Sequence, residues 1–114
     1  MKKDSKIFGF ILLFFMVFAI SGCKKSESVK IGFLFNSDIT YRFVVESNYF
    51  AERARQLGAE VIVKHANDNA SLQYEMAMQM KEEGIDLLTL VYINEITVDA
   101  IVRDMKVDGI PVIA

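Results

Sequence analysis

The chain has 114 residues, a formal net charge of −2 and a hydrophobic content of 53%. This length fits one small domain, and the acidic balance argues against nucleic-acid binding, which depends on Lys and Arg side chains that neutralise phosphates. A single cysteine cannot form an internal disulfide, so we expect an apolar core to stabilise the fold.

The first 22 residues have the composition of an export signal. Three lysines and one aspartate accompany an apolar run at 7–20, which is too short to span a bilayer but suits a signal peptide. The run ends in the sequence ISGC at 20–23, which resembles a bacterial lipobox. We therefore predict a lipoprotein signal peptide at 1–22, acylation of Cys23, and a location in the periplasm or cell envelope with a lipid anchor in the membrane. An ordinary cleaved signal, with Cys23 at the cut by chance, is the alternative.

Without those three lysines and that aspartate, 10 basic and 14 acidic side chains remain, a net charge of −4. Residues 23–29 are then the acylated cysteine and a short polar tether. Runs rich in Val, Ile, Leu and Phe predict buried strands at Lys30–Phe35, Glu60–His65, Asp86–Tyr92 and Pro111–Ala114. Apolar residues at helical spacing predict one helix in each intervening segment: Phe43, Phe50, Ala54 and Leu57; Leu72, Met76 and Met80; Val98, Ile101, Val102 and Met105. Glycines at 58, 84 and 109 mark the helix ends.

This alternation predicts an α/β fold over 30–114 with an open parallel sheet, in the order β-α-β-α-β-α-β. No helix follows the last predicted strand, so we expect a fragment of a longer protein or a truncated product. For the common strand order 2-1-3-4, a ligand lies where the order reverses, between the loops after the first and third strands. Those loops are 36–42 and 92–95.

The first loop has the mixture of side chains that a sugar needs. Asp38 supplies a carboxylate that accepts hydroxyl protons, Arg42 supplies a guanidinium fork, and Phe43 supplies an aromatic face. Composition alone nevertheless favours a solvated loop without a ligand, because polar loops are common.

Several short stretches have the residues and spacing of one known family. They are VKIG at 29–32, RF at 42–43, LGAEV at 57–61, ANDN at 66–69 with Gln73, GIDLL at 84–88, Asn94, and GIPVIA at 109–114. Through them, 29–114 resembles the start of the N-terminal lobe of a type I periplasmic sugar-binding protein, in particular the D-xylose-binding proteins of ABC importers. The resemblance implies a solute-binding lipoprotein that captures a monosaccharide, a xylose-like pentose or a related sugar, and delivers it to an ABC permease. We expect a monomer with no enzymatic activity and no cofactor.

The resemblance also implies roles for individual residues. Arg42 lies where these proteins place an arginine that hydrogen-bonds the sugar, and Phe43 lies where they have a tryptophan. Asn94 matches an asparagine after the third strand, where it serves the site or caps the next helix. A further set, for which we favour capping and loop structure over ligand contact, is Asn67, Asn69 and Gln73.

This chain departs from the family pattern near the site, which leaves the sugar open. YINE at 92–95 replaces a Pro-Tyr-Asn-Gly pattern, and the first loop lacks the acidic pair of the xylose binders. The alternative function is a sugar sensor that signals to a membrane receptor or kinase, and neighbouring genes would separate the two.

The sequence gives little support for a catalytic site, a metal site or another function of this fold class. His65 is the only histidine and has no Cys or His partner in sequence, so we predict neither a metal site nor a general base. A phospho-accepting receiver domain needs acidic residues after the first and third strands, and the sequence has Asn36-Ser37 and Tyr92 there. A transcriptional regulator of this fold would begin with a basic helix-turn-helix, where this chain has the lipobox-like sequence.

Overall fold

The computed structural model describes residues 27–114, so the predicted signal peptide, Cys23 and most of the predicted tether lie outside the described residues. Strands and helices alternate in the order β1 (Lys30–Phe35), α2 (Tyr41–Gln56), β2 (Glu60–His65), α3 (Ala70–Glu82), β3 (Leu87–Leu90), α4 (Glu95–Val107) and β4 (Val112–Ile113). Within 27–114, no helix has the length and apolar character needed to cross a membrane.

The four strands form one parallel sheet in the order β2-β1-β3-β4. β1 is a central strand: it pairs with β2 along Lys30–Phe35 and with β3 along Ile31–Leu34. β4 pairs with β3 over two residues. The predicted α/β class, parallel sheet and strand order are confirmed.

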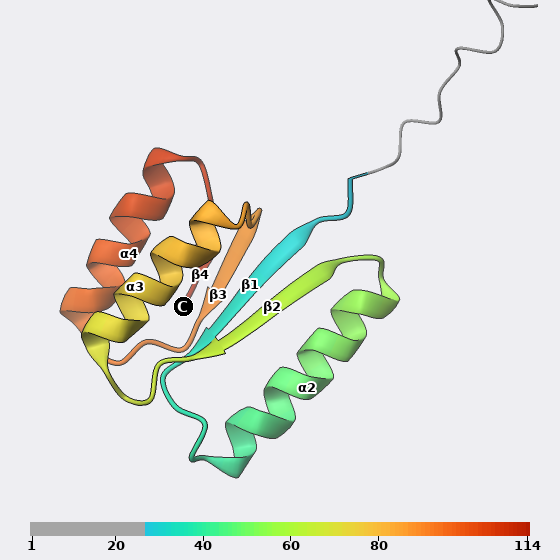
Figure 1. Cartoon of the computed structure of the whole chain (residues 1–114), viewed down its shortest axis with the longest axis horizontal. Helices are drawn as coiled ribbons and strands as arrows, with labels where there is room; N and C mark the ends of the chain where they lie inside the picture. Colours follow the sequence, from blue (N-terminus) through green and yellow to red (C-terminus); the bar gives the residue numbers. More distant parts are fainter. Residues whose placement is uncertain (1–26) are drawn as a thin grey trace, which may run out of the picture.

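Helices cover both faces of the sheet, with α2 on one side and α3 and α4 on the other (Figure 1). Because successive side chains of a strand point to opposite faces, Phe33 and Phe35 pack towards α2 whereas Leu34 packs towards α3 and α4. The buried residues on the α3–α4 side are Leu34, Ala77, Met80, Ile85, Leu88, Leu90, Ile101 and Met105. Those on the α2 side are Phe33, Phe35, Ala51 and Val61. Each fully buried large side chain stabilises the fold by roughly 1.5–3 kcal/mol.

Helix α3 packs closely on β1 because Gly32 has no side chain. A Cβ at Gly32 would lie 3.0 Å from Met80 Sδ and 3.1 Å from Ile85 Cδ1, closer than ordinary packing allows. The turn between α3 and β3 contains Gly84 at φ +80°, a left-handed conformation that residues with a Cβ rarely adopt. It ends α3 at the glycine that the sequence marked.

The later strands are shorter than predicted. β3 is Leu87–Leu90 rather than 86–92, and β4 is Val112–Ile113 rather than 111–114. A strand extends only as far as its hydrogen-bonded pairing with a neighbour, and β4 pairs with only two residues of β3. The apolar sequence of β3 extends one residue past the end of the strand at Leu90. Val91 lies in the following loop, but its side chain still packs against the α2-side core.

Two residues predicted on buried helical stripes are exposed. Leu57 is 71% exposed because α2 ends at Gln56 and Leu57 is its C-cap. Val102 is 40% exposed, since it lies on the flank of α4 opposite Asp104, whose carboxylate reaches α3.

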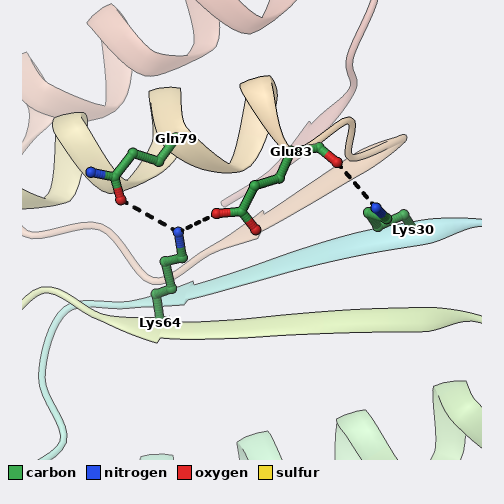
Figure 2. A network of polar contacts seen from close by, with 4 residues as sticks. All are labelled: Lys30, Lys64, Gln79 and Glu83. Carbon is green, nitrogen blue, oxygen red and sulfur yellow. Dashed lines mark hydrogen bonds and ion pairs between the residues drawn. The ribbon is translucent and has the colours of Figure 1, made fainter.

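A polar network connects the edge strand β2 to α3 (Figure 2). Lys64 Nζ donates to Glu83 Oε1 at 2.7 Å and to Gln79 Oε1 at 3.4 Å, while Lys30 Nζ donates to the backbone oxygen of Glu83 at 3.1 Å. These side chains are partly exposed, so water screens the Lys64–Glu83 pair and its contribution is about 0.5 kcal/mol.

Candidate functional site

Two loops lie together at the carboxyl edge of the sheet. β1 is followed by 36–40 and then α2, whereas β3 is followed by 91–94 and then α4. β1 and β3 are neighbours, yet their chains leave to opposite faces of the sheet (Figure 1). This is the switch point of an open parallel sheet, where ligands bind in this fold class.

The loop after β1 is held by its own turn. Ser37 is buried, and its Oγ accepts a hydrogen bond from the Ile39 N–H at 3.3 Å. Ser and Asn side chains stabilise such tight turns by binding the backbone two residues on. The turn leaves Asp38 and Tyr41 exposed at the edge.

Arg42 is the second residue of α2, and its guanidinium is exposed. Its Nε donates to Glu46 Oε1 at 2.6 Å, an i,i+4 ion pair on the same helix. This hydrogen bond, with the charge of Glu46, raises the pKa of Arg42, so the group stays positively charged. Within 27–114, its two terminal nitrogens have no hydrogen-bond partner, which leaves them available to a ligand.

Phe43 lies next to Arg42 but points into the fold. Its ring centroid is 5.8 Å from that of Phe35, and the side chain is partly buried against the α2-side core. Much of the ring therefore packs on Phe35 and fixes the first turn of α2.

The loop after β3 presents Tyr92 and Asn94. Tyr92 is 47% exposed. Asn94 is the N-cap of α4, and its Oδ1 accepts a hydrogen bond from the Thr97 N–H at 2.9 Å. The side-chain NH2 of Asn94 has no partner within 27–114. The cap and a ligand contact would therefore use different atoms of one side chain.

The stretch entering α3 is structural, as the sequence favoured. Asn69 is the N-cap of α3 and accepts a hydrogen bond from the Leu72 N–H at 3.0 Å. Asn67 lies in the preceding loop at φ +50°. Gln73 is fully buried and hydrogen-bonds the backbone of the loop after β3: its Nε2 donates to Val91 O at 2.9 Å, and its Oε1 accepts from the Ile93 N–H at 3.1 Å.

Two polar atoms at this edge are buried without a hydrogen-bond partner among residues 27–114, Asn36 Oδ1 and His65 Nδ1. Asn36 Nδ2 donates to Asp68 Oδ1 at 3.4 Å, and the His65 ring stacks on Phe35. Asn36 was not among the site residues predicted from the sequence. Its position could have indicated it, because Asn36 is the first polar residue after a buried strand at the switch point.

The structure places Asp38 and Asn94 in the two edge loops and Arg42 in the first turn of α2 beside them, but no hydrogen bond within 27–114 joins the three to one another. An apolar hollow of about 470 Å³ lies at the opposite, amino edge and includes Val29, Phe50 and Leu57 in its lining, so it is remote from these loops. In the described part of the chain, no group of three His, Cys, Asp or Glu side chains could hold a metal ion.

Comparison with known proteins gives consistent similarities. No family model matches the chain. The chain is 30% identical over 89 residues to the D-xylose-binding periplasmic protein of Escherichia coli K12, covering 78% of this chain and 27% of that protein. An ABC transporter solute-binding protein from Clostridium phytofermentans with bound β-D-glucose superposes with a TM-score of 0.71 at 21% identity, over 75% of this chain and 26% of that one. The fructose-binding periplasmic domain of a hybrid two-component system superposes with a TM-score of 0.64 at 28% identity. The superposition covers 74% of this chain and 28% of that one.

These findings confirm the resemblance that the sequence predicted. The described residues have the type I periplasmic-binding fold, in part, and the chain is similar in sequence to D-xylose-binding periplasmic proteins. It spans little more than a quarter of the length of the curated relatives that it matches.

Proposed function

We propose that this lobe belongs to a solute-binding protein that captures a monosaccharide outside the cytoplasm and delivers it to an ABC importer. The observation that carries the proposal is the switch point, where Asp38, Arg42 and Asn94 are all exposed in a sheet of this topology. Sequence similarity to a D-xylose-binding protein supports the same reading. Fold alone would not suffice, because one fold hosts many functions.

The chemistry of the edge suits a sugar. Hydroxyl groups both donate and accept hydrogen bonds, and the edge offers the Asp38 carboxylate as acceptor and the Arg42 and Asn94 N–H groups as donors. Exposed rings of Tyr41 and Tyr92 offer apolar faces for the C–H side of a sugar ring. The protein would bind and release its ligand unchanged, as a monomer, without enzymatic activity or cofactor.

The substrate class that we propose is a pentose of the xylose type or a related monosaccharide. The similarity to D-xylose-binding proteins favours xylose. A panel of pentoses and hexoses titrated into the complete natural protein would identify the ligand, and binding of none of them would reject the proposal.

The role of Arg42 can be tested by calorimetry on the complete natural protein. Replacing Arg42 by Ala leaves sugar hydroxyls unpaired, which costs about 2 kcal/mol, or roughly thirtyfold in affinity. Arg55→Ala, on the last turn of the same helix, is the matched control and should leave affinity unchanged. Binding by Arg42→Ala within twofold of the parent would show that the arginine does not contact the sugar.

We also propose that Cys23 carries the lipid that anchors the protein. The support is the lipobox-like sequence at 20–23 and its position before a short polar tether. Mass spectrometry of membrane-extracted protein should detect a diacylglyceryl adduct on Cys23, and Cys23→Ala should block processing. Soluble, unmodified mature protein would contradict the anchor.

A sugar sensor is the second candidate. The observation that favours it is the similarity to the fructose-binding periplasmic domain of a hybrid two-component system. Genes for a permease and an ATPase beside this one would favour the importer, whereas a gene for a membrane receptor or kinase would favour the sensor.

A further inference from the structure

Gln73 is a polar side chain placed where an apolar one would fill the core. It is fully buried on α3, among the largest side chains with no exposure. A buried amide costs free energy unless its hydrogen bonds are made. Both of the hydrogen bonds that the Gln73 side chain makes go to one loop, at Val91 O and the Ile93 N–H, and neither goes to its own helix. The stability of α3 therefore does not explain the choice of glutamine.

The two backbone groups that Gln73 binds lie past the end of the β3 ladder. β3 ends at Leu90, and its pairing with β4 covers only residues 88–89. Among residues 27–114, Val91 O and the Ile93 N–H are bonded by the Gln73 side chain and by no strand. The side-chain amide of Gln73 makes the two hydrogen bonds that the backbone of a neighbouring strand could make, because it presents a donor and an acceptor as a peptide group does.

These bonds fix the part of the loop that carries the candidate site. They hold the residues on either side of Tyr92, and Ile93 directly precedes Asn94. Asn94 is in turn fixed by its cap to the Thr97 N–H. The chain from Val91 to Thr97 is thus bound at both ends, with Tyr92 and Asn94 between.

We propose that Gln73 is a positioning residue of the ligand site, which holds the loop after β3 so that Tyr92 and Asn94 face the carboxyl edge. Gln73 does not touch the ligand. The inference rests on the proposed function for the identity of the ligand, but the hold on the loop is measurable without one.

The test uses the complete natural protein with Gln73→Met, which keeps length and volume but removes both hydrogen bonds. Gln79→Met makes the same change at an exposed position of the same helix and is the matched control. For Gln73→Met we expect hydrogen exchange over 91–97 to accelerate at least tenfold while exchange in β1 and β2 is unchanged, because the loss of even one buried hydrogen bond corresponds to about tenfold. Sugar affinity should fall about tenfold. Gln79→Met should change neither.

Gln73→Glu separates positioning from simple filling of space. Burial raises the pKa of a carboxyl group at this position. Above that pKa the carboxylate faces the carbonyl oxygen of Val91, whereas below it the protonated group restores one donor and one acceptor. For Gln73→Glu, protection of 91–97 from hydrogen exchange and affinity for the sugar should both return towards the values of the parent as pH falls. Each value is compared with that of the parent at the same pH, and Gln73→Met should show no such recovery. If Gln73→Met does not fold, the pH series of Gln73→Glu decides the question.

The outcomes separate this inference from the proposed function. Unchanged exchange over 91–97 in Gln73→Met would overturn the inference. So would faster exchange with sugar affinity within twofold of the parent, and in that case the proposed function would stand. A parent that binds no monosaccharide would reject the proposed function, and faster exchange confined to 91–97 would still support the hold of Gln73 on the loop.

Discussion

Asn94 caps a helix in the structure, and we propose that it also contacts the ligand, a role that the sequence presented as the alternative. Its Oδ1 caps α4, while its side-chain NH2 has no hydrogen-bond partner in the described part of the chain and can donate to a ligand. The amide is suited to both because it carries an acceptor and a donor on one short side chain. Substitutions that remove one atom at a time can therefore separate the two roles.

We expect Asn94→Ala to lower the free energy of unfolding by about 1 kcal/mol through loss of the cap. Asn94→Asp keeps the acceptor and places negative charge at a helix N-terminus, so its stability should match the parent to within about 0.5 kcal/mol. Both variants lose the NH2 donor and should bind the sugar more weakly. Urea unfolding and calorimetry measure the two effects, with the exposed Asn48→Ala on α2 as control. Equal stability of the Ala and Asp variants would contradict the capping role.

The sequence predicts local contacts of the site better than distant ones. Capping by Asn69 and Asn94 joins residues three apart, so the pattern of polar residue and following helix is enough to suggest it. The partners of Gln73 are 18 and 20 residues away and depend on how β3 and α3 pack. The burial of the Phe43 ring against Phe35 depends likewise on the packing of α2 on β1.

At the scale of elements, α3 and α4 are joined by a polar contact beside the core. Tyr74 O–H donates to Asp104 Oδ2 at 2.6 Å, and Lys81 Nζ donates to Asp104 O at 3.2 Å. Lys81 also pairs with Asp108. The Tyr74 hydrogen bond lowers the pKa of Asp104 and raises the pKa of Tyr74.

This contact should make the helix pair sensitive to pH at both extremes. The lowered pKa of Asp104 means that its contribution to stability is present above the ordinary value of 3.8 and is lost as pH falls through the folded-state pKa. The raised pKa of Tyr74 means that its contribution is present below 10.0 and is lost as pH rises through the folded-state pKa. Tyr74→Phe should therefore lower Tm at neutral pH, with a difference from the parent that narrows at both extremes. Tyr49→Phe, at an exposed tyrosine, is the control. A Tm difference that stays constant with pH would contradict the role of this pair.

The elements themselves follow from the sequence to different degrees. β1 and β2 have the predicted bounds, because their full lengths pair with one another. β3 and β4 are shorter than their apolar runs, since a ladder also requires a partner residue at each position. Leu57 continues the helical spacing, but it follows the last residue of α2 and remains 71% exposed.

For the molecule as a whole, the candidate site is an open edge. Asp38, Arg42 and Asn94 are all exposed, and they lie in the two edge loops and the first turn of α2. Binding sites for small molecules usually bury most of the ligand surface. This edge can touch one side of a sugar, while the hydroxyl groups on the other side remain in water.

We therefore expect residues 24–114 alone to bind common monosaccharides no more tightly than roughly millimolar, because these contacts barely offset the lost translational and rotational freedom. Calorimetry or a chemical-shift titration would measure the constant, with the complete natural protein as reference. A micromolar constant for residues 24–114 would show that the site is misplaced or that copies of the lobe complete it together.

The central position of β1 in the sheet also affects when the sheet can form during synthesis of the chain. Among the four strands described, β1 is synthesised first, yet its partner residues begin at Glu60 on one side and Leu87 on the other. At about 5–20 residues per second, a ribosome adds the 56 residues that separate Ile31 from its β3 partner in roughly 3–11 seconds. During that interval the β3-facing edge of β1 has no partner. The sheet can therefore be completed only when residues 87–90 have followed β1 out of the ribosome.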